Sequence, residues 1–209
     1  MKFEIKHTTK YTYEHTASDN INEIRLAPRT SSLQTCLEHQ ITITPQASLF
    51  TFEDYFGNMV NSFSVIEPHK ELIIDCHSIV LTKDSNLSLD LASLSENDFK
   101  LIQSEIFKNQ FAEFLVFTYY TKITEDIKNF VESNLETKTT SVYSTLKILT
   151  ELIYQSFVYD PTATNVSTTA QNALLMRKGV CQDFSHLMLA CCRYLGIPAR
   201  YISGYHFVG

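Results

Sequence analysis

The sequence predicts an α+β protein, and two patterns of hydrophobic residues predict this class. Up to about residue 85, hydrophobic and polar residues alternate, as they do along strands that bury one face. From about residue 86 onwards, hydrophobic residues recur every three or four positions, as they do along one face of a helix. We therefore expect an antiparallel β-rich domain at 1–85, a helical connecting segment at 86–140 and the first part of an α+β core at 141–209.

The strands of the β-rich domain are predicted from short alternating runs. These runs lie around Phe3 and Ile5, around Ile41 and Ile43, and between Leu72 and Leu81. The stretch TFEDYFGNMVNSFSVIEP, at 51–68, has two β-prone runs separated by Gly57 and Asn58, which is typical of a hairpin. The stretch NEIRLAPR, at 22–29, is expected to end as a strand at Pro28, because proline has no N–H group to donate.

Three apolar stripes predict the longer helices. The stripes consist of Phe99, Ile102 and Ile106; of Ile123, Ile127, Phe130 and Val131; and of Val142, Leu146, Leu149, Leu152, Ile153 and Phe157. The first helix is expected to open at Ser95, with Asp98 three residues later as a variant capping box. Pro161 is expected to end the segment that carries the third stripe.

Two more helices and a strand are predicted in the last part of the chain. The stretch NVSTTAQNALLMRKG predicts a short helix that Thr168 caps and that Gly179 follows in the left-handed conformation. The next helix is expected to begin near Cys181 and to end at Gly196. The stretch ARYISGY, at 199–205, alternates as a strand does.

The composition disfavours several classes of protein. The net charge is −6 and no run of Lys or Arg occurs, so we expect no nucleic-acid partner. The start, MKFEIKHTTKYTYEH, lacks the apolar segment of a secretory signal, and no apolar run reaches the roughly 20 residues of a membrane helix. We therefore expect a cytoplasmic protein without a membrane partner. The five cysteines are irregularly spaced, so we expect reduced thiols, no metal site and no cofactor.

Cys181 has the sequence position of a nucleophile. It is expected one or two residues into a helix that follows a tight Gly-Val turn. Free backbone N–H groups and the positive end of the helix dipole favour a thiolate there, and the same N–H groups can hold a developing oxyanion. This pattern is typical of a Cys–His acyl-transfer enzyme. The alternative is that Cys181 is a small buried residue at the start of a helix.

The other four cysteines are interpreted as structural. Cys191 and Cys192 lie mid-helix among apolar neighbours, where the helix dipole has no effect on a thiol, and Cys36 and Cys76 lie in strand-like segments. A redox or metal protein based on Cys191 and Cys192 is disfavoured, since neighbouring helical cysteines point in different directions.

The segment GVCQDFSHLMLACCRYLGIPARYISGY resembles the nucleophile segment of the bacterial transglutaminase-like superfamily. TTAQNALLMRKG is similar to the helix that precedes it in that family, and NEIRLAPR, DYFGN and EPH resemble the family's β-rich N-terminal region. The resemblance implies a papain-like core, a Cys-His-Asp triad with Cys181 as its nucleophile, and a thioester formed from a carboxamide or peptide carbonyl. It also implies a protein or peptide substrate and the activity of a cysteine protease or related hydrolase.

The histidine and aspartate of that triad follow on later strands in the family, and these 209 residues contain neither in that context. His186 lies five positions after Cys181, about 140° around a helix, so we interpret it as structural. His206 is expected on the strand after the helix and could in principle approach the thiol, although it matches the strand before the one that carries the family's histidine. Asp183 is interpreted as a first-turn acid that suits the helix dipole. We therefore expect an inactive chain, truncated within its catalytic core, whose edge strand at 199–205 can pair with a second copy.

Two functions are compatible with these observations. The first is a transglutaminase-like cysteine enzyme, a peptidase or amidase rather than a protein cross-linker, that acts through a thioester on Cys181. The second is a non-catalytic module, in which a β-rich domain before a degenerate core binds peptides or serves as a scaffold.

Overall fold

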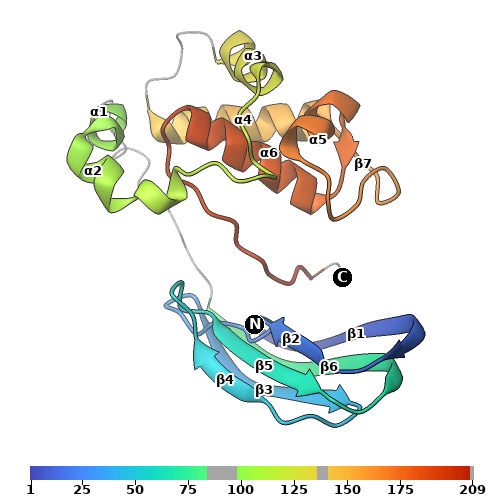
Figure 1. Ribbon diagram of the computed structural model, residues 1–209. Helices are drawn as coiled ribbons and strands as arrows, with labels where there is room; N and C mark the ends of the chain where they lie inside the picture. Colours follow the sequence, from blue (N-terminus) through green and yellow to red (C-terminus); the bar gives the residue numbers. More distant parts are fainter. Residues whose placement is uncertain (84–97, 136–140, 208–209) are drawn as a thin grey trace. The chain divides into compact units, whose positions relative to one another are not determined.

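The computed structural model describes residues 1–83, 98–135 and 141–207, and the statements below concern these residues. Ser95, the predicted first cap, lies outside them. The chain divides into two compact units, Met1–Leu87 (unit 1) and Ser88–Gly209 (unit 2), drawn in Figure 1. Each unit has its own hydrophobic core, so each is described by itself.

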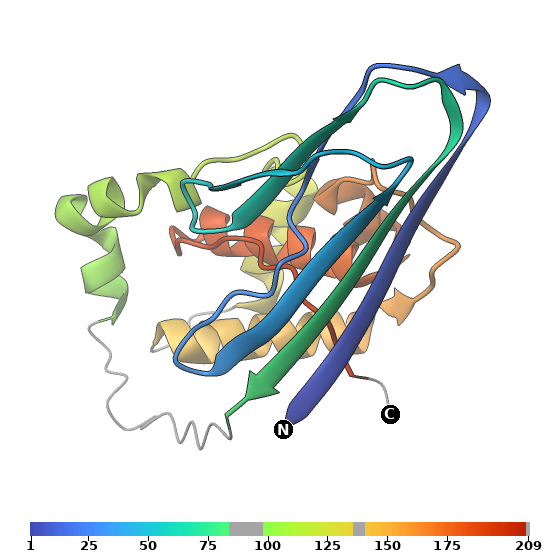
Figure 2. The same cartoon turned by 90° about the horizontal axis from the view of Figure 1, so that it is seen from below.

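Unit 1 consists of two antiparallel sheets of three strands each. The first has the order β1-β6-β3, and its strands are Lys2–Ala17, His69–Thr82 and Gln34–Thr44; they run side by side in Figure 2. The second has the order β2-β5-β4, and its strands are Asn20–Ile24, Met59–Val65 and Phe50–Glu53. The predicted antiparallel β-rich start of an α+β chain is confirmed.

The two sheets of unit 1 pack face to face through the alternating residues of their strands. Every second residue of β6 is buried: Leu72, Ile74, Cys76, Ser78 and Val80. Leu72 and Ile74 form one core cluster with Ile43 of β3 and with Phe63 and Val65 of β5. Burial of one face of each sheet in this way removes apolar surface from water and stabilises the unit.

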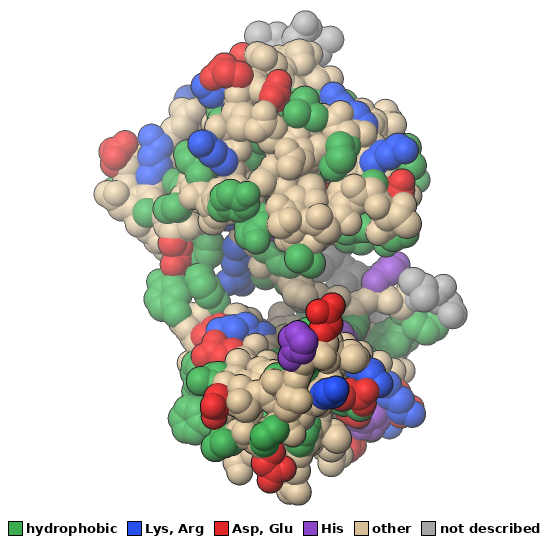
Figure 3. Space-filling model, turned by 45° about the vertical axis from the view of Figure 1, so that its right-hand side comes forward, with side chains coloured by type: hydrophobic (Ala, Val, Ile, Leu, Met, Phe, Trp, Pro, Cys, Tyr) green, Lys and Arg blue, Asp and Glu red, His purple; other side chains and the backbone are tan. Residues whose placement is uncertain are grey.

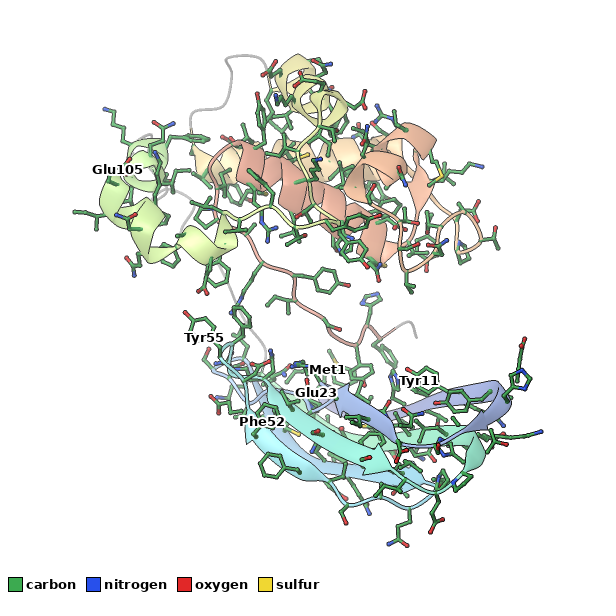
Figure 4. The ribbon with its side chains drawn as sticks, in the orientation of Figure 1. Met1, Tyr11, Glu23, Phe52, Tyr55 and Glu105 are labelled. Carbon is green, nitrogen blue, oxygen red and sulfur yellow. The ribbon has the colours of Figure 1, made fainter. Side chains whose placement is uncertain are left out.

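The predicted hairpin is confirmed, and a single carboxylate organises its turn. The turn joins β4 to β5 at 54–58, and Gly57 adopts a φ of +75°, in the left-handed region that favours glycine. Asp54 accepts hydrogen bonds from the backbone N–H groups of Phe56 and Asn58. The side chain of Asn58 also donates to Asp54, and the two bonds from Asn58 contribute most to lowering the pKa of Asp54 to about 2. Tyr55 projects from the tip of the turn, as Figure 4 shows.

A polar group interrupts the buried face of the first sheet. His39 Nδ1 lies 2.8 Å from Ser78 Oγ, and Cys76 Sγ lies 3.7 Å from each of these two atoms. His39 Nε2 is buried and has no hydrogen-bond partner among the described residues. Burial disfavours the charged imidazolium and lowers the pKa of His39 from its ordinary 6.5.

Unit 2 begins with two short helices where the first apolar stripe predicted one. They are α1, Asp98–Gln103, and α2, Glu105–Gln110. Ser104 separates them, because its hydroxyl donates to Leu101 O at the end of α1 and accepts from Phe107 N at the start of α2. One 3₁₀ turn follows at Ala112–Phe114. The predicted stripe is therefore wrong at Ile106, whose side chain is 84% exposed.

The next two stripes form helices as predicted. They are α3, Glu125–Asn134, and α4, Val142–Ser156. Ser141 caps α4 by accepting a hydrogen bond from Ser144 N. The buried faces of these helices join α5, Ala170–Met176, and α6, Cys181–Tyr194, in the core cluster of unit 2, and Figure 1 shows α6 alongside α4. The largest fully buried members of that cluster are Ile127, Val131, Leu149 and Leu187.

Helix α5, Ala170–Met176, leads to the turn before Cys181 and corrects two predictions. Thr169, not Thr168, caps it by accepting from Asn172 N; Thr168 is buried and bonds to Asn165 N. Arg177, not Gly179, takes the left-handed conformation, with φ of +55°. Its guanidinium carbon lies about 5 Å above the ring centres of Phe130 and Phe157, and these cation–π contacts favour an arginine over a glycine there.

Gly179 is needed for a different reason: its lack of a side chain leaves room for a carboxylate. It belongs to β8, Lys178–Gly179, which pairs in parallel with β7, Val158–Tyr159. A Cβ atom at Gly179 would lie 2.6 Å from Asp183 Oδ2. Asp183 belongs to α6, Cys181–Tyr194. The strand and the first turn of α6 can therefore approach this closely only with glycine at 179.

Helix α6 begins at Cys181 as predicted, and Gly196, with φ of +74°, follows its end. The strand predicted at 199–205 is wrong: residues 199–207 have no regular structure, and 201–207 are exposed. A strand needs a neighbour to accept its hydrogen bonds, whereas this segment is anchored at its start by Arg193, which donates to Ala199 O. Among the described helices, none is both long and apolar enough to traverse a bilayer.

We expect acid to weaken unit 1 through His39. Because the folded pKa of His39 lies below 6.5, the unfolded chain takes up this proton first as pH falls. Stability from this residue is therefore full above pH 6.5 and declines as pH falls from there toward the folded pKa. Urea unfolding between about pH 7.5 and pH 5 should show a steeper loss for the wild type than for His39→Gln. Parallel losses in both proteins would refute this assignment.

We expect Gly179→Ala to destabilise unit 2 by about 1–3 kcal/mol, because the new methyl group overlaps the Asp183 carboxylate. Denaturant unfolding followed by circular dichroism measures this loss. Gly204→Ala is the matched control, since a Cβ atom there meets no heavy atom within 4 Å. Equal effects of the two substitutions would show that the close approach at 179 carries no strain.

Candidate active site

Cys181 is the first residue of α6, and its side chain is exposed. Among the described residues, its N–H group and that of Gln182 donate no hydrogen bond, as is usual in the first turn of a helix. Val180 precedes the helix in extended conformation, and an apolar side chain at this capping position cannot accept from these groups. The sulfur therefore lies beside open N–H donors at the positive end of a helix. The alternative of a buried structural thiol is wrong for Cys181.

Asp183 is buried beneath the same turn, with 1% of its surface exposed. Its Oδ2 accepts a hydrogen bond of 2.8 Å from Val180 N and one of 2.6 Å from Thr164 Oγ1. Its Oδ1 is buried and has no partner among the described residues. The interpretation of Asp183 as a first-turn acid is therefore incomplete, because the carboxylate also bonds to the residue before the helix and to a separate loop.

That loop, residues 160–169, is attached to the turn at two points. Asp160 N donates to Gly179 O at 2.9 Å, and Thr164 bonds to Asp183. The loop has internal hydrogen bonds as well: Asp160 Oδ1 accepts from Thr162 N and Oγ1. Sequence patterns gave no signal for Thr164, because the stretch PTATNVSTTA has several hydroxyl residues and no periodicity that distinguishes one of them.

The structure does not bring the two later histidines to the thiol. The His186 ring packs against Tyr120 and Tyr201, with ring centres 5.4 and 5.8 Å away. Burial lowers the pKa of His186 below 6.5, and its Nδ1 is buried without a partner in the described part of the chain. Among the described residues, no hydrogen bond or ion pair joins Cys181 to His186 or His206. The structural interpretation of His186 agrees with these contacts.

The remaining thiols differ from Cys181 in their surroundings. Burial raises the pKa of Cys191 to about 12 and that of Cys192 to about 11. Cys76 is buried, and burial also raises the pKa of Cys36.

In the three described stretches, no three His, Cys, Asp or Glu side chains gather in a way that could hold a metal ion. On the face drawn in Figure 3, side chains of both charges are interspersed within each unit.

A groove of about 370 Å³ lies between α4, α6 and the segment 199–202. Apolar side chains line most of it, among them Ile153, Phe184 and Met188. Ser185 also lines it and donates to Cys181 O at 2.7 Å, one helical turn from the thiol. The groove therefore opens along the face of α6 that continues from Cys181.

Several related sequences align with nearly the whole chain. An uncharacterized protein of Mycobacterium leprae is 31% identical over 207 residues, which are 98% of this chain and 71% of that protein. Uncharacterized proteins of Mycobacterium tuberculosis and Mycobacterium bovis are 32% identical over 206 residues, and the chain spans 65% of their length.

The fold has a counterpart among solved structures. The crystal structure of a "Putative Cysteine Protease" from Cytophaga hutchinsonii has a TM-score of 0.72, is 23% identical and matches 95% of this chain and 65% of its own. Two family models match as well: the bacterial transglutaminase-like N-terminal region at 3–81 and the transglutaminase-like superfamily at 128–208. The chain therefore belongs to the transglutaminase-like superfamily, with the N-terminal region of its bacterial branch.

Proposed function

We propose that the protein is a cysteine peptidase or amidase that acts through a thioester on Cys181. The observation that carries this proposal is an exposed thiol at the first position of α6. It lies beside the N–H groups of Cys181 and Gln182, which donate no hydrogen bond among the described residues. Membership in the superfamily and the likeness to a "Putative Cysteine Protease" agree with it. Cys191 and Cys192 are excluded as nucleophiles by burial, which keeps them as thiols.

The reaction begins when the Cys181 thiolate attacks the carbonyl carbon of an amide and forms a C–S bond. The carbonyl oxygen becomes an oxyanion, which the N–H groups of Cys181 and Gln182 can hold. The C–N bond then breaks, the amine leaves with a proton from a general acid, and a thioester remains on the sulfur. Water attacks the thioester, releases a carboxylic acid and restores the thiol.

Among the described residues, no hydrogen bond or ion pair joins Cys181 to a histidine or a carboxylate that could serve as general acid or base. His186 packs against Tyr120 and Tyr201, and the family resemblance of the sequence implies a histidine and an aspartate on strands that follow the nucleophile helix. We therefore propose that the 209-residue chain alone cleaves amides very slowly, since loss of a triad member lowers kcat by about 10⁴ or more. The fact that the chain spans 65–71% of its relatives' length agrees with this proposal.

The second candidate function is peptide binding without catalysis. The apolar groove beside α6 favours it, because such a groove can take apolar side chains of an extended peptide. Replacement of Cys181 by Ala distinguishes the two functions: it abolishes hydrolysis by an enzyme but leaves the affinity of a binding module for its peptide unchanged.

We expect Cys181 to react with iodoacetamide at about pH 6 roughly tenfold faster than glutathione, because its exposed sulfur lies at the positive end of the α6 dipole beside open N–H groups. Cys191 and Cys192 should stay unmodified in the folded chain, since burial raises their pKa. Mass spectrometry of each cysteine-containing peptide measures the rates, and the unfolded chain, where all five cysteines react alike, is the control. A rate for Cys181 no greater than that of glutathione would sink the proposal.

We also expect the 209-residue chain to separate two kinds of substrate. A p-nitrophenyl ester should acylate Cys181 with release of one equivalent of nitrophenolate, because this leaving group needs no proton. A p-nitroanilide of the same acyl group should react at least about 10³-fold more slowly, since its amine must be protonated. Absorbance at the start of the reaction and the mass of the acylated chain give both values. Cys181→Ser is the control, and an equal burst from it would place the acylation elsewhere.

A further inference from the structure

We infer that Asp183, held by Thr164, is a positioning residue that keeps the N–H groups of Cys181 and Gln182 open for the oxygen of the bound carbonyl. This inference rests on the function proposed for Cys181. It concerns two residues that take no part in the proposed bond-making steps. It also gives a reason for the residues found at the start of the helix.

The first argument is the kind of residue that precedes the helix. Helices α4 and α5 of the same unit are preceded by Ser141 and Thr169, whose side chains accept from the third N–H groups of these helices, Ser144 N and Asn172 N. In α6 the third N–H group, that of Asp183, donates to Val180 O, so an acceptor at position 180 would be left with the N–H group of Gln182. Val180 precedes α6 in the extended conformation that suits a cap, with φ of −115° and ψ of 179°, but it has no acceptor in its side chain.

The second argument is the direction in which Asp183 makes its bonds. An aspartate in the first turn can itself accept from nearby N–H groups of that turn. Here Oδ2 instead accepts from Val180 N, which precedes the helix, and the carboxylate accepts from neither Cys181 N nor Gln182 N among the described residues. Thr164 donates to the same oxygen at 2.6 Å. The loop thereby holds the carboxylate in an orientation that leaves the first two N–H groups of α6 open.

The third argument is the cost of this arrangement. A carboxylate that is 1% exposed has its second oxygen, Oδ1, buried without a partner among the described residues. A buried acceptor without a donor destabilises a fold. Position 179 is moreover restricted to glycine by the same carboxylate. Local arrangements that cost stability in this way are typical of functional sites.

Electrostatics act in the same direction as geometry. A carboxylate two residues from the sulfur repels a thiolate, and two donors on Oδ2 reduce that repulsion. Loss of the Thr164 hydroxyl therefore has two effects on Cys181. It frees the carboxylate to turn toward the N–H groups of the helix, and it leaves the charge of the carboxylate less compensated by hydrogen-bond donors. Both effects lower the reactivity of the thiol.

The experiment compares Thr164→Val, Thr164→Ser and Thr162→Val in the 209-residue chain. The rate of alkylation of Cys181 is measured from about pH 5 to pH 9, together with the unfolding midpoint of each protein. We expect Thr164→Val to lower the rate at about pH 7 by three- to tenfold and to move the pH profile upward, as for loss of a hydrogen bond to a charged group. Thr164→Ser should restore the wild-type profile. Thr162→Val is the matched control, because its hydroxyl bonds to Asp160 in the same loop.

Val180→Thr tests the inference without removal of any bond. Threonine is nearly isosteric with valine, and its hydroxyl can accept from Gln182 N, because the next N–H group, that of Asp183, already donates to Val180 O. We expect this substitution to raise the unfolding midpoint and at the same time to lower the alkylation rate of Cys181 about threefold or more, because the N–H group of Gln182 is then occupied. Opposite changes in stability and reactivity are not expected from a purely structural role.

The outcomes separate this inference from the function on which it rests. If wild-type Cys181 reacts rapidly and neither Thr164→Val nor Val180→Thr changes its pH profile, Asp183 and Thr164 are structural and the inference is wrong, while the proposed function stands. If wild-type Cys181 reacts like an ordinary thiol, the proposed function fails and the inference fails with it.

Discussion

The contact between the Asp183 carboxylate and the backbone at Gly179 and Val180 determines where Cys181 lies. The carboxylate is buried, accepts from Val180 N and comes so close to Gly179 that no other residue fits there. A strand and a helix are thus held together at the residue between them, with little freedom for the turn. The Cα–Cβ bond of a cysteine on such a turn has a fixed direction, whereas that of a cysteine on an independent loop would not. The reaction proposed at Cys181 depends on this fixed backbone, since N–H donors stabilise an oxyanion only when they are already aligned.

The rest of unit 2 holds the helix that carries the carboxylate. Leu187 and Cys191 of α6 are completely buried against α3, α4 and α5, so rotation of the helix would expose apolar surface. Arg193, further along α6, donates to Phe114 O, Thr121 Oγ1 and Ala199 O. No carboxylate balances this half-buried cation in the described ranges, and burial lowers the pKa of Arg193. Its three carbonyl and hydroxyl partners join the segments on either side of α6 to the helix.

Hydrophobic periodicity predicted the class of fold and the longer elements, because α3, α4, α6 and the strands of unit 1 each bury one face. The predictions failed where local chemistry overrides periodicity. Ser104 divides a stripe into two helices by bonding to both. Residues 199–205 alternate, but alternation does not supply a neighbouring strand. The position of Cys181 at the first residue of α6 followed from the glycine and valine before it. Thr164 could not be predicted, since its bond to Asp183 joins residues 19 positions apart in sequence.

The site divides the proposed reaction into two parts with different physical requirements. Attack and oxyanion binding need a nucleophilic sulfur and N–H donors, and the first turn of α6 brings together the exposed sulfur of Cys181 and the open N–H groups of Cys181 and Gln182. Proton transfer to a leaving amine needs a titratable group within hydrogen-bond reach of the reacting atoms. His186 fails this requirement for a geometric reason: five residues separate it from Cys181 on one helix, and Tyr120 and Tyr201 pack against its ring. An acid that serves Cys181 must therefore approach from an element other than α6, on the side where the thiol is exposed. A helix start with open N–H donors is suited to an acid on a second element. The helix stabilises the negative charge of the oxyanion, and the second element transfers the proton to the leaving amine.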